Sequence, residues 1–168
     1  KSEIVFRLVP AWYIKTSELK PKLIECANSV KWEPASNGKR MNDWLTNMGD
    51  WNISRKRYYG MPLPFYPCDC GHITVVGSKA ELREHAVDPA QVDALPELHR
   101  PWVDEVKIKC PHCGKAVSRV SDIGDVWLDA GIVPFSTLGY FTDREAWEKN
   151  FPAEWVTEMH EQVRLWFY

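Results

Sequence analysis

Apolar positions in the first fifty residues follow two periods, which predict one strand and two helices. Residues 4–9 form an almost unbroken apolar run, which indicates an extended strand. Ser17 is the predicted N-cap of a helix with Pro21 in its first turn, where proline is tolerated. A second helix is predicted over residues 38–48, ended by Gly49. The predicted core positions of these helices are Leu19, Leu23, Ile24, Ala27 and Val30 in the first and Met41, Trp44, Leu45 and Met48 in the second.

The section that follows alternates short strands with loops. Residues 50–65 are predicted to form a loop that leads into a strand, and further strands are predicted at 73–76 and 106–109. Ser78 and Glu81 form a capping box that begins a helix. The remaining predicted elements are a polar loop through Leu95 and Pro96, a strand end and turn over 125–131, a short helix opened by Thr142 and Glu145, and a helix or strand over 155–168.

Four cysteines occur in two close pairs, and each pair is followed by a glycine. Glycine permits the tight turns that let thiolates close around one ion. Four thiolates are a common ligand set of a tetrahedral structural zinc site. We therefore predict a structural zinc ion bound by Cys68, Cys70, Cys110 and Cys113.

Other roles for the cysteines and their neighbours remain open. His72 and His112 lie beside the pairs and are alternative ligands. The odd count of five cysteines, without an apolar signal segment, favours a reduced intracellular protein over a disulfide-linked secreted one. Cys26 falls in an apolar helical pattern and is predicted to be a buried, inert thiol.

Composition adds few constraints. The chain of 168 residues is 45% hydrophobic and 26% charged, which is ordinary for one globular domain or two small lobes. Its net charge of −2 argues against a general nucleic-acid-binding protein, although residues 55–57 form a local basic run. The first residue is lysine and the last three are large and apolar, so we expect a piece of a longer protein.

Four segments resemble, in order, signatures of the class I aminoacyl-tRNA synthetases for isoleucine, leucine and valine. Residues 53–64 are similar to the family's Ile-Ser-Arg-Gln-Arg-Tyr-Trp-Gly-x-Pro-x-Pro signature. The other similar segments are residues 98–104, 124–131 and 158–168, and the isoleucine members of the family are the most similar. The resemblance covers nearly the whole chain.

The resemblance implies an α/β fold: part of a Rossmann-type catalytic domain with a small, β-rich, zinc-ribbon-like insertion and helices from the end of an editing insertion. By this resemblance, residues 1–50 are the exit from the editing insertion, and residues 51–64 return to the Rossmann fold. Residues 65–122 are the zinc-binding insertion, and residues 123–168 are the amino-acid-binding part of the catalytic domain.

The resemblance also implies that the parent protein is an isoleucine-tRNA ligase. Such an enzyme uses ATP and Mg²⁺ to form an isoleucyl-adenylate, mainly through positioning and charge stabilisation, and transfers isoleucine to its tRNA. The implied partners are isoleucine, ATP and the isoleucine tRNA, and the implied parent is cytoplasmic, monomeric and free of membranes. The family's His-Ile-Gly-His and Lys-Met-Ser-Lys-Ser signatures are absent from these residues, so we expect no catalysis by this piece alone and assign no catalytic residue.

Five positions match family residues that contact the adenylate or the isoleucine side chain. Glu158 matches a glutamate whose carboxylate can accept hydrogen bonds from the substrate ammonium or ribose hydroxyls. The other matching positions are Glu161 and Gln162, which align with an Asp-Gln pair, and Trp127 and Trp166, which align with aromatic walls of the pocket. The chain departs from the family where Met159 and Leu165 replace glycines and Glu161 replaces an aspartate, so membership of the class is better supported than isoleucine specificity.

Two alternatives remain. The parent could be the valine or leucine member of the same family, or the chain could be a free-standing zinc-ribbon module that binds RNA or a protein. Without the resemblance, Trp127 and Trp166 fit ordinary core packing equally well. Glu158 then fits a solvated helix face.

Overall fold

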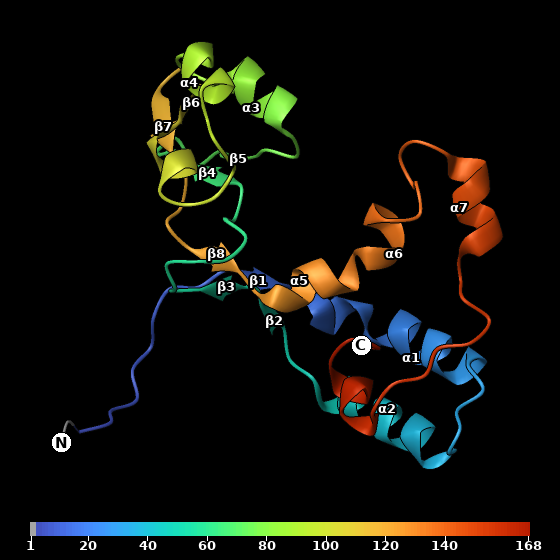
Figure 1. Cartoon of the computed structure of the whole chain (residues 1–168). Coiled ribbons are helices and arrows are strands. Elements are labelled where there is room, and N and C mark those ends of the chain that lie inside the picture. The colour runs from blue at the N-terminus through green and yellow to red at the C-terminus, as the bar shows by residue number, and fades with distance from the viewer. Residues whose placement is uncertain (1–2) are drawn as a thin grey trace. The chain divides into compact units, whose positions relative to one another are not determined.

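The computed structural model describes residues 3–168, which divide into two compact units. The first unit comprises the described residues up to Ile53 together with Val126–Tyr168, and the second comprises Ser54–Asp125. Both contain short helices and two-stranded antiparallel sheets (Figure 1). This mixture of helices and small sheets agrees with the predicted α/β class.

The elements of each unit have the following bounds. The first unit contains β1 Tyr13–Ile14, the 3-10 helix η1 Thr16–Leu19, α1 Lys20–Ser29, α2 Ser36–Asn47, β2 Trp51–Asn52, α5 Val126–Gly131, α6 Val133–Ser136, α7 Arg144–Asn150 and the 3-10 helix η3 His160–Arg164. The second contains β3 Ser54–Arg55, β4 Phe65–Pro67, β5 Ile73–Val75, α3 Lys79–His85, α4 Pro89–Asp93, the 3-10 helix η2 Trp102–Glu105, β6 Lys107–Lys109, β7 Ala116–Ser118 and β8 Ile123–Gly124.

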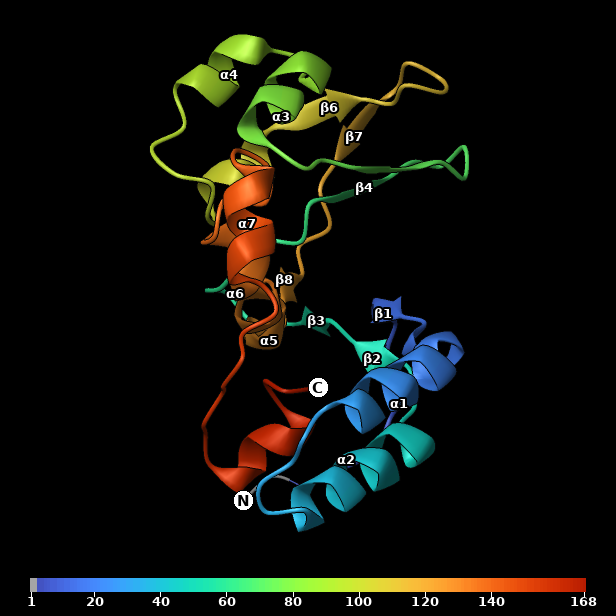
Figure 2. The ribbon, with the colours of Figure 1, turned by 90° about the vertical axis from the view of Figure 1, so that its right-hand side faces the viewer.

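The core of the first unit lies between α1, α2 and η3, and α1 and α2 run side by side (Figure 2). Its buried members are Ala27, Met41, Leu45, Met48 and Val163. The rings of Phe167 and Tyr168 pack edge-on against Trp32 and Trp44, with centroids 6.2 and 5.9 Å apart. The predicted second helix is therefore confirmed, and the C-terminal aromatic residues pack beside it.

The prediction of a strand at residues 4–9 is wrong. These residues carry no strand assignment, and β1 instead pairs Tyr13 with Asn52. Phe6 and Leu8 are fully exposed. No described strand pairs with this segment, and a strand without a hydrogen-bonded neighbour is not stable.

The first helix forms, but its ends and its cysteine differ from the prediction. Ser17 lies in η1 and is not an N-cap, since its hydroxyl donates to Asp50 Oδ1 at 2.6 Å. Cys26 is exposed, because the buried position of α1 is the next residue, Ala27. Gly49 is not needed to end α2, because Met48 already leaves the helix with φ −62° and ψ 147°.

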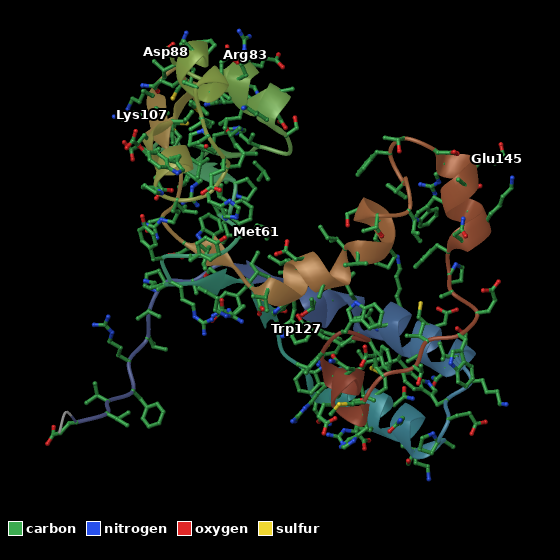
Figure 3. The ribbon with its side chains drawn as sticks, viewed as in Figure 1. Met61, Arg83, Asp88, Lys107, Trp127 and Glu145 are labelled. Atoms are coloured by element: carbon green, nitrogen blue, oxygen red, sulfur yellow. The ribbon has the colours of Figure 1, made fainter. Side chains whose placement is uncertain are left out.

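Several short helices begin at aspartates that the sequence pattern did not single out. The Asp143 carboxylate accepts a hydrogen bond from Ala146 N–H at 3.0 Å and begins α7, whereas the prediction used Thr142 as the cap. Asp88, labelled in Figure 3, caps α4 inside the predicted polar loop through its 3.0 Å hydrogen bond from Ala90 N–H. Residues 126–131 form α5 where a turn was predicted, and of the helix or strand predicted over 155–168 only His160–Arg164 is helical, as η3.

The second unit is built on two β-hairpins, β4–β5 and β6–β7. In each strand the middle residue is buried and its two neighbours are more exposed. The buried residues lie opposite one another, Tyr66 opposite Thr74 and Ile108 opposite Val117. Their buried side chains join a core with α3, α4 and η2, whose members are Tyr66, Val76, Leu82, Ala86, Val92, Val103, Val106, Ile108, Cys110 and Val117. The predicted strands at 73–76 and 106–109 and the helix begun by Ser78 are confirmed in substance.

Candidate metal centre and C-terminal segment

The turns of the two hairpins differ by one residue in length, but each carries one cysteine pair and each is closed by a hydrogen bond from a glycine N–H to the carbonyl of the pair's first cysteine. In the first, Gly71 N–H donates to Cys68 O at 2.9 Å and Cys68 N–H donates to His72 O at 2.8 Å. In the second, Gly114 N–H donates to Cys110 O at 2.8 Å. Gly71 and Gly114 have φ of 88° and 73°, a left-handed conformation that glycine adopts without strain.

These two turns bring the four thiols together. Sγ of Cys68 lies 3.5 Å from that of Cys113, and Sγ of Cys70 lies 3.7 Å from that of Cys110. All four sulfur atoms lie within 4.8 Å of one another. Thiolates bound at about 2.3 Å to a tetrahedral ion lie roughly 3.8 Å apart, so the four cysteines are placed to bind one metal ion.

The local electrostatics shift the pKa values of Cys110 and Cys113 in opposite directions. Burial opposes ionisation of Cys110, but hydrogen bonds from the N–H groups of Cys113 and His112 outweigh it and lower its pKa to about 7. At Cys113, a hydrogen bond from Lys115 N–H favours the thiolate, but the neighbouring thiols outweigh it and raise the pKa to about 12. Four thiolates at this spacing repel one another, and a cation between them removes that repulsion.

The two histidines beside the cysteines form a pair of their own. The rings of His72 and His112 stack with centroids 6.1 Å apart and planes 16° apart. Within residues 3–168, the group of side chains that could hold a metal consists of the four thiols alone. The geometry therefore favours the cysteine set over one in which a histidine replaces a cysteine.

The C-terminal candidates lie on and around η3. Gln162 organises this turn, because its Oε1 accepts from Trp166 N–H at 3.2 Å and its carbonyl accepts from Phe167 N–H at 2.9 Å. Glu161 Oε1 lies 3.4 Å from His160 Nε2, while its Oε2 is buried without a hydrogen-bond partner. Glu158 is exposed.

One candidate tryptophan, Trp166, contacts the short helix α5 that carries the other, Trp127. Trp166 Nε1 donates to Ala130 O at 2.9 Å, and Ala130 lies on the same short helix as Trp127 (Figure 3 labels Trp127). Both indole side chains are partly exposed. The structure thus places Trp127, Trp166 and Gln162 in one region, with a buried carboxylate oxygen of Glu161 on the same turn.

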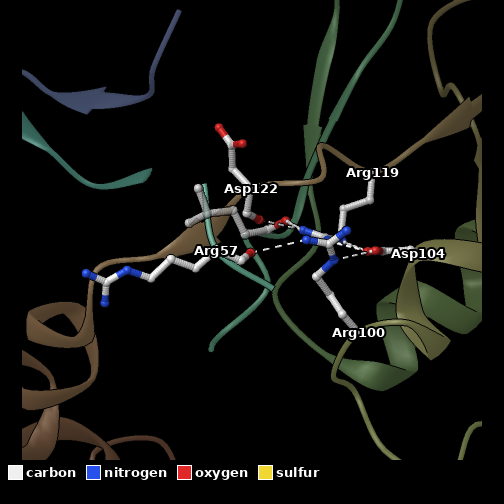
Figure 4. A network of polar contacts seen from close by, with 6 residues as sticks. Arg57, Arg100, Asp104, Arg119 and Asp122 are labelled. Atoms are coloured by element: carbon white, nitrogen blue, oxygen red, sulfur yellow. Dashed lines mark hydrogen bonds and ion pairs between the residues drawn. The ribbon is translucent and has the colours of Figure 1, made fainter. Parts of the chain in front are cut away.

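Sequence reasoning missed a network centred on Asp104 (Figure 4). This carboxylate accepts from Arg100 Nε at 2.7 Å and from both Nε and an Nη of Arg119, the Nε contact at 3.0 Å. The Arg119 side chain is only 1% exposed. Burial opposes ionisation of Asp104, but the two guanidinium groups outweigh it and lower its pKa. The four-residue spacing of Arg100 and Asp104 was the available signal, whereas nothing local indicated Arg119.

An ion pair connects two segments that resemble family signatures. An Nη of Arg55 donates to Asp125 Oδ2, and the Asp125 side chain is 8% exposed. The pair lies beside the ladder in which Ser54 of β3 opposes Gly124 of β8. The segments at 53–64 and 124–131 therefore start from a common two-stranded sheet.

Comparison with known proteins identifies the class to which these features belong. The model of the class I tRNA synthetases for isoleucine, leucine, methionine and valine matches residues 1–168. The chain therefore belongs to this family. The match extends well beyond the cysteine-bearing section, which favours the synthetase interpretation over a free-standing zinc module.

Relatives with similar sequences include isoleucine–tRNA ligases. The chain is 40% identical to that of Methanopyrus kandleri and 38% identical to that of Saccharolobus solfataricus, each over all of this chain and 17% of the relative. It is 42% identical to the ligase of Clostridium tetani over 94% of this chain and 15% of the relative. The chain thus spans about one-sixth of the length of these relatives. None of the helices between residues 3 and 168 combines the length and apolar character needed to cross a membrane.

Proposed function

We propose that this chain is part of an isoleucine–tRNA ligase. The observation that carries the proposal is the 38–42% identity to such ligases across 94–100% of the chain. The family also contains leucine, methionine and valine members, so the amino acid is the part of the proposal that most needs an experiment.

The four cysteines bind a structural Zn²⁺ in this proposal. Zinc accepts four thiolates in a tetrahedron, and the support is the clustering of the sulfur atoms within 4.8 Å. The ion joins the turns of two hairpins whose strands have only three residues each. Its role is to hold residues 65–122 as a zinc-ribbon-like insertion, since such short hairpins are marginal alone.

The rest of the chain is divided in the proposal as the resemblance implies. Residues 1–50 leave the editing insertion, residues 51–64 return to a Rossmann-type catalytic domain, and residues 123–168 form its amino-acid side. The support for this division is the family match over the whole chain together with the order of the signature segments.

The proposed reaction begins when a carboxylate oxygen of isoleucine attacks the α-phosphate of ATP. A P–O bond forms, the bond to the departing pyrophosphate breaks, and isoleucyl-adenylate results. Glu158, Glu161 and Gln162 hold the ammonium and ribose hydroxyls, which positions the reactants and supplies charge where it develops. Trp127 and Trp166 wall the side-chain pocket, and Gln162 keeps its amide N–H₂ available while its Oε1 orders the turn.

A tRNA ribose hydroxyl then attacks the acyl carbon and AMP departs. The proposed partners are therefore ATP with Mg²⁺, isoleucine and the isoleucine tRNA, in a cytoplasmic and monomeric parent. An apolar pocket separates isoleucine from valine by only about 1–3 kcal/mol per methylene, so editing elsewhere in the parent is part of the proposal.

Amino-acid-dependent exchange of pyrophosphate into ATP by the parent protein tests the proposal. We expect isoleucine to support exchange with a kcat/KM at least about tenfold above that of valine, and leucine to give less. Exchange that prefers valine or leucine assigns the parent to another member of the family. No exchange with any of the three contradicts the proposal.

A further inference from the structure

One largely exposed segment of the second unit has a backbone held at both ends by arginine side chains, of which Arg119 is buried and Arg100 is partly exposed. Arg119 donates to Leu63 O and to Asp122 O, each at 2.9 Å, and Arg100 donates to Arg57 O at 3.2 Å (Figure 4). Both guanidinium groups are held in turn by the Asp104 carboxylate. The backbone between residues 57 and 63 is therefore anchored by a charged network of which one member is almost wholly buried.

The middle of the segment is fixed as well. Met61 O accepts from Gly124 N–H at 2.6 Å, and Leu63 N–H donates to Asp122 O at 3.2 Å. Gly60 adopts φ of 145°, which side-chain-bearing residues rarely adopt. We conclude that residues 57–63 follow one defined path.

This fixed backbone presents two aromatic rings to solvent. Tyr58 is 62% exposed and Tyr59 is 74% exposed. Each ring is supported from behind, since Arg100 Cζ lies 5.2 Å from the centroid of Tyr58 and His99 stacks on Tyr59 at 5.4 Å with planes 1° apart. Rings that are held in place before binding lower the entropy cost of binding a partner, so this arrangement suits a binding surface.

The chemistry of this surface fits unpaired nucleotides. An exposed aromatic face accepts a stacked base of any kind, and nearby cations attract the phosphate backbone. Lys56 and Arg57 are exposed on the same segment, while Arg100 and His99 stiffen the rings. Protein interfaces are also enriched in tyrosine and arginine but are depleted in lysine, so the exposed Lys56 beside the rings is the feature that favours a nucleic acid over a protein.

We propose that Lys56, Arg57, Tyr58 and Tyr59 form a binding surface for an unpaired segment of the tRNA, with Arg100, Asp104 and Arg119 as its positioning residues. This inference rests on the proposed function, because it takes the tRNA as the source of the RNA. It adds a nucleic-acid contact to a chain whose net charge of −2 gives no general affinity for RNA.

The test uses the full parent protein and measures the dissociation constant for its tRNA together with tRNA-independent pyrophosphate exchange. Tyr58→Ala combined with Tyr59→Ala is expected to raise that constant about tenfold or more and to leave exchange unchanged. With Tyr58 left unchanged, Tyr59→Trp keeps an aromatic ring at this position and is expected to bind the tRNA as the wild type does, unlike Tyr59→Ala. Tyr13→Ala is the matched control, since Tyr13 is 58% exposed and lies in the other unit, and it should leave both quantities unchanged.

The inference is overturned if the dissociation constant of the double alanine variant stays within twofold of the wild type while exchange is intact. The same result is expected if the surface binds a protein and not the tRNA. If the double alanine variant loses exchange, Lys56→Gln with Arg57→Gln replaces it. The dissociation constant of that variant must rise, and the slope of its dependence on salt concentration must fall by the contribution of about two phosphate contacts. An unchanged slope overturns the inference. Failure of the wild-type parent to exchange pyrophosphate with isoleucine is a different result, because it contradicts the proposed function itself.

Discussion

At the scale of single residues, Gly60 occupies a position that has no room for a side chain. A Cβ added there would lie 2.4 Å from Ile123 Cδ1, and φ is 145°. Gly60→Ala is therefore expected to destabilise the second unit by about 1–3 kcal/mol. Amide hydrogen exchange of residues 54–125 in the parent measures this. Gly49→Ala is the control, because an added Cβ meets nothing within 4 Å there, and equal effects of the two changes would contradict the account.

Asp104 is the residue on which the polar network depends. Asp104→Asn leaves two guanidinium groups without their shared anion, so we expect local destabilisation of about 3 kcal/mol, seen as faster exchange of the amides around residues 57–63. Asp93→Asn removes an ion pair of similar 2.8 Å geometry in which both side chains are over half exposed. That control is expected to have little effect on stability, because solvent screens an exposed ion pair.

The lowered pKa of Asp104 gives this network a defined dependence on pH. Because the folded-state pKa lies below the usual value of 3.8, the unfolded state binds the proton more tightly, and stability is lost as pH falls below about 4. The charged and titratable groups that affect this carboxylate are Arg100, Arg119 and Tyr66. Urea unfolding between pH 6 and pH 3 should show a smaller loss of stability in Asp104→Asn than in the wild type. Loss of metal in acid affects both proteins alike, so an identical pH dependence would count against the network.

At the scale of elements, the sequence predicted those whose signals are local and missed those that depend on partners. The apolar stripe of Met41, Leu45 and Met48 specified α2, and Ser78 with Glu81 specified the start of α3. The strand at residues 4–9 failed because a strand requires a neighbour, and apolar content alone does not provide one. The cysteine pairs were predictable as a site because each turn carries its own glycine, whereas the contacts of Arg119 join positions up to 56 residues apart.

The two hairpins supply the clearest prediction at this scale. Cys110→Ser removes the one fully buried thiol of the cluster. We expect the parent to lose one zinc ion relative to the wild type and residues 65–122 to lose protection against hydrogen exchange. Cys26→Ser is the matched control, because Cys26 is exposed and lies in the other unit, and it should retain the zinc content of the wild type. Elemental analysis measures the metal, and an unchanged zinc content in Cys110→Ser would contradict a four-thiolate site.

At the scale of the whole molecule, the chain combines a unit that carries the four-cysteine cluster with a unit that contains the proposed substrate residues. The family assignment rests on sequence along the entire chain, and no single element defines it. The substrate site could be predicted only by resemblance. Glu158 is exposed, and one carboxylate oxygen of Glu161 is buried without a partner, so local geometry alone assigns neither of them a ligand.

The measurement that tests the account most directly is isoleucine-dependent pyrophosphate exchange by the parent carrying Glu158→Gln. Loss of a charge-assisted hydrogen bond to the substrate is expected to lower kcat/KM roughly 10- to 100-fold with the melting temperature unchanged. Glu154→Gln, which changes another exposed glutamate nearby, should behave as the wild type. If Glu158→Gln is as active as Glu154→Gln, or loses activity and stability together, then Glu158 does not contact the adenylate and the proposed substrate site is wrong.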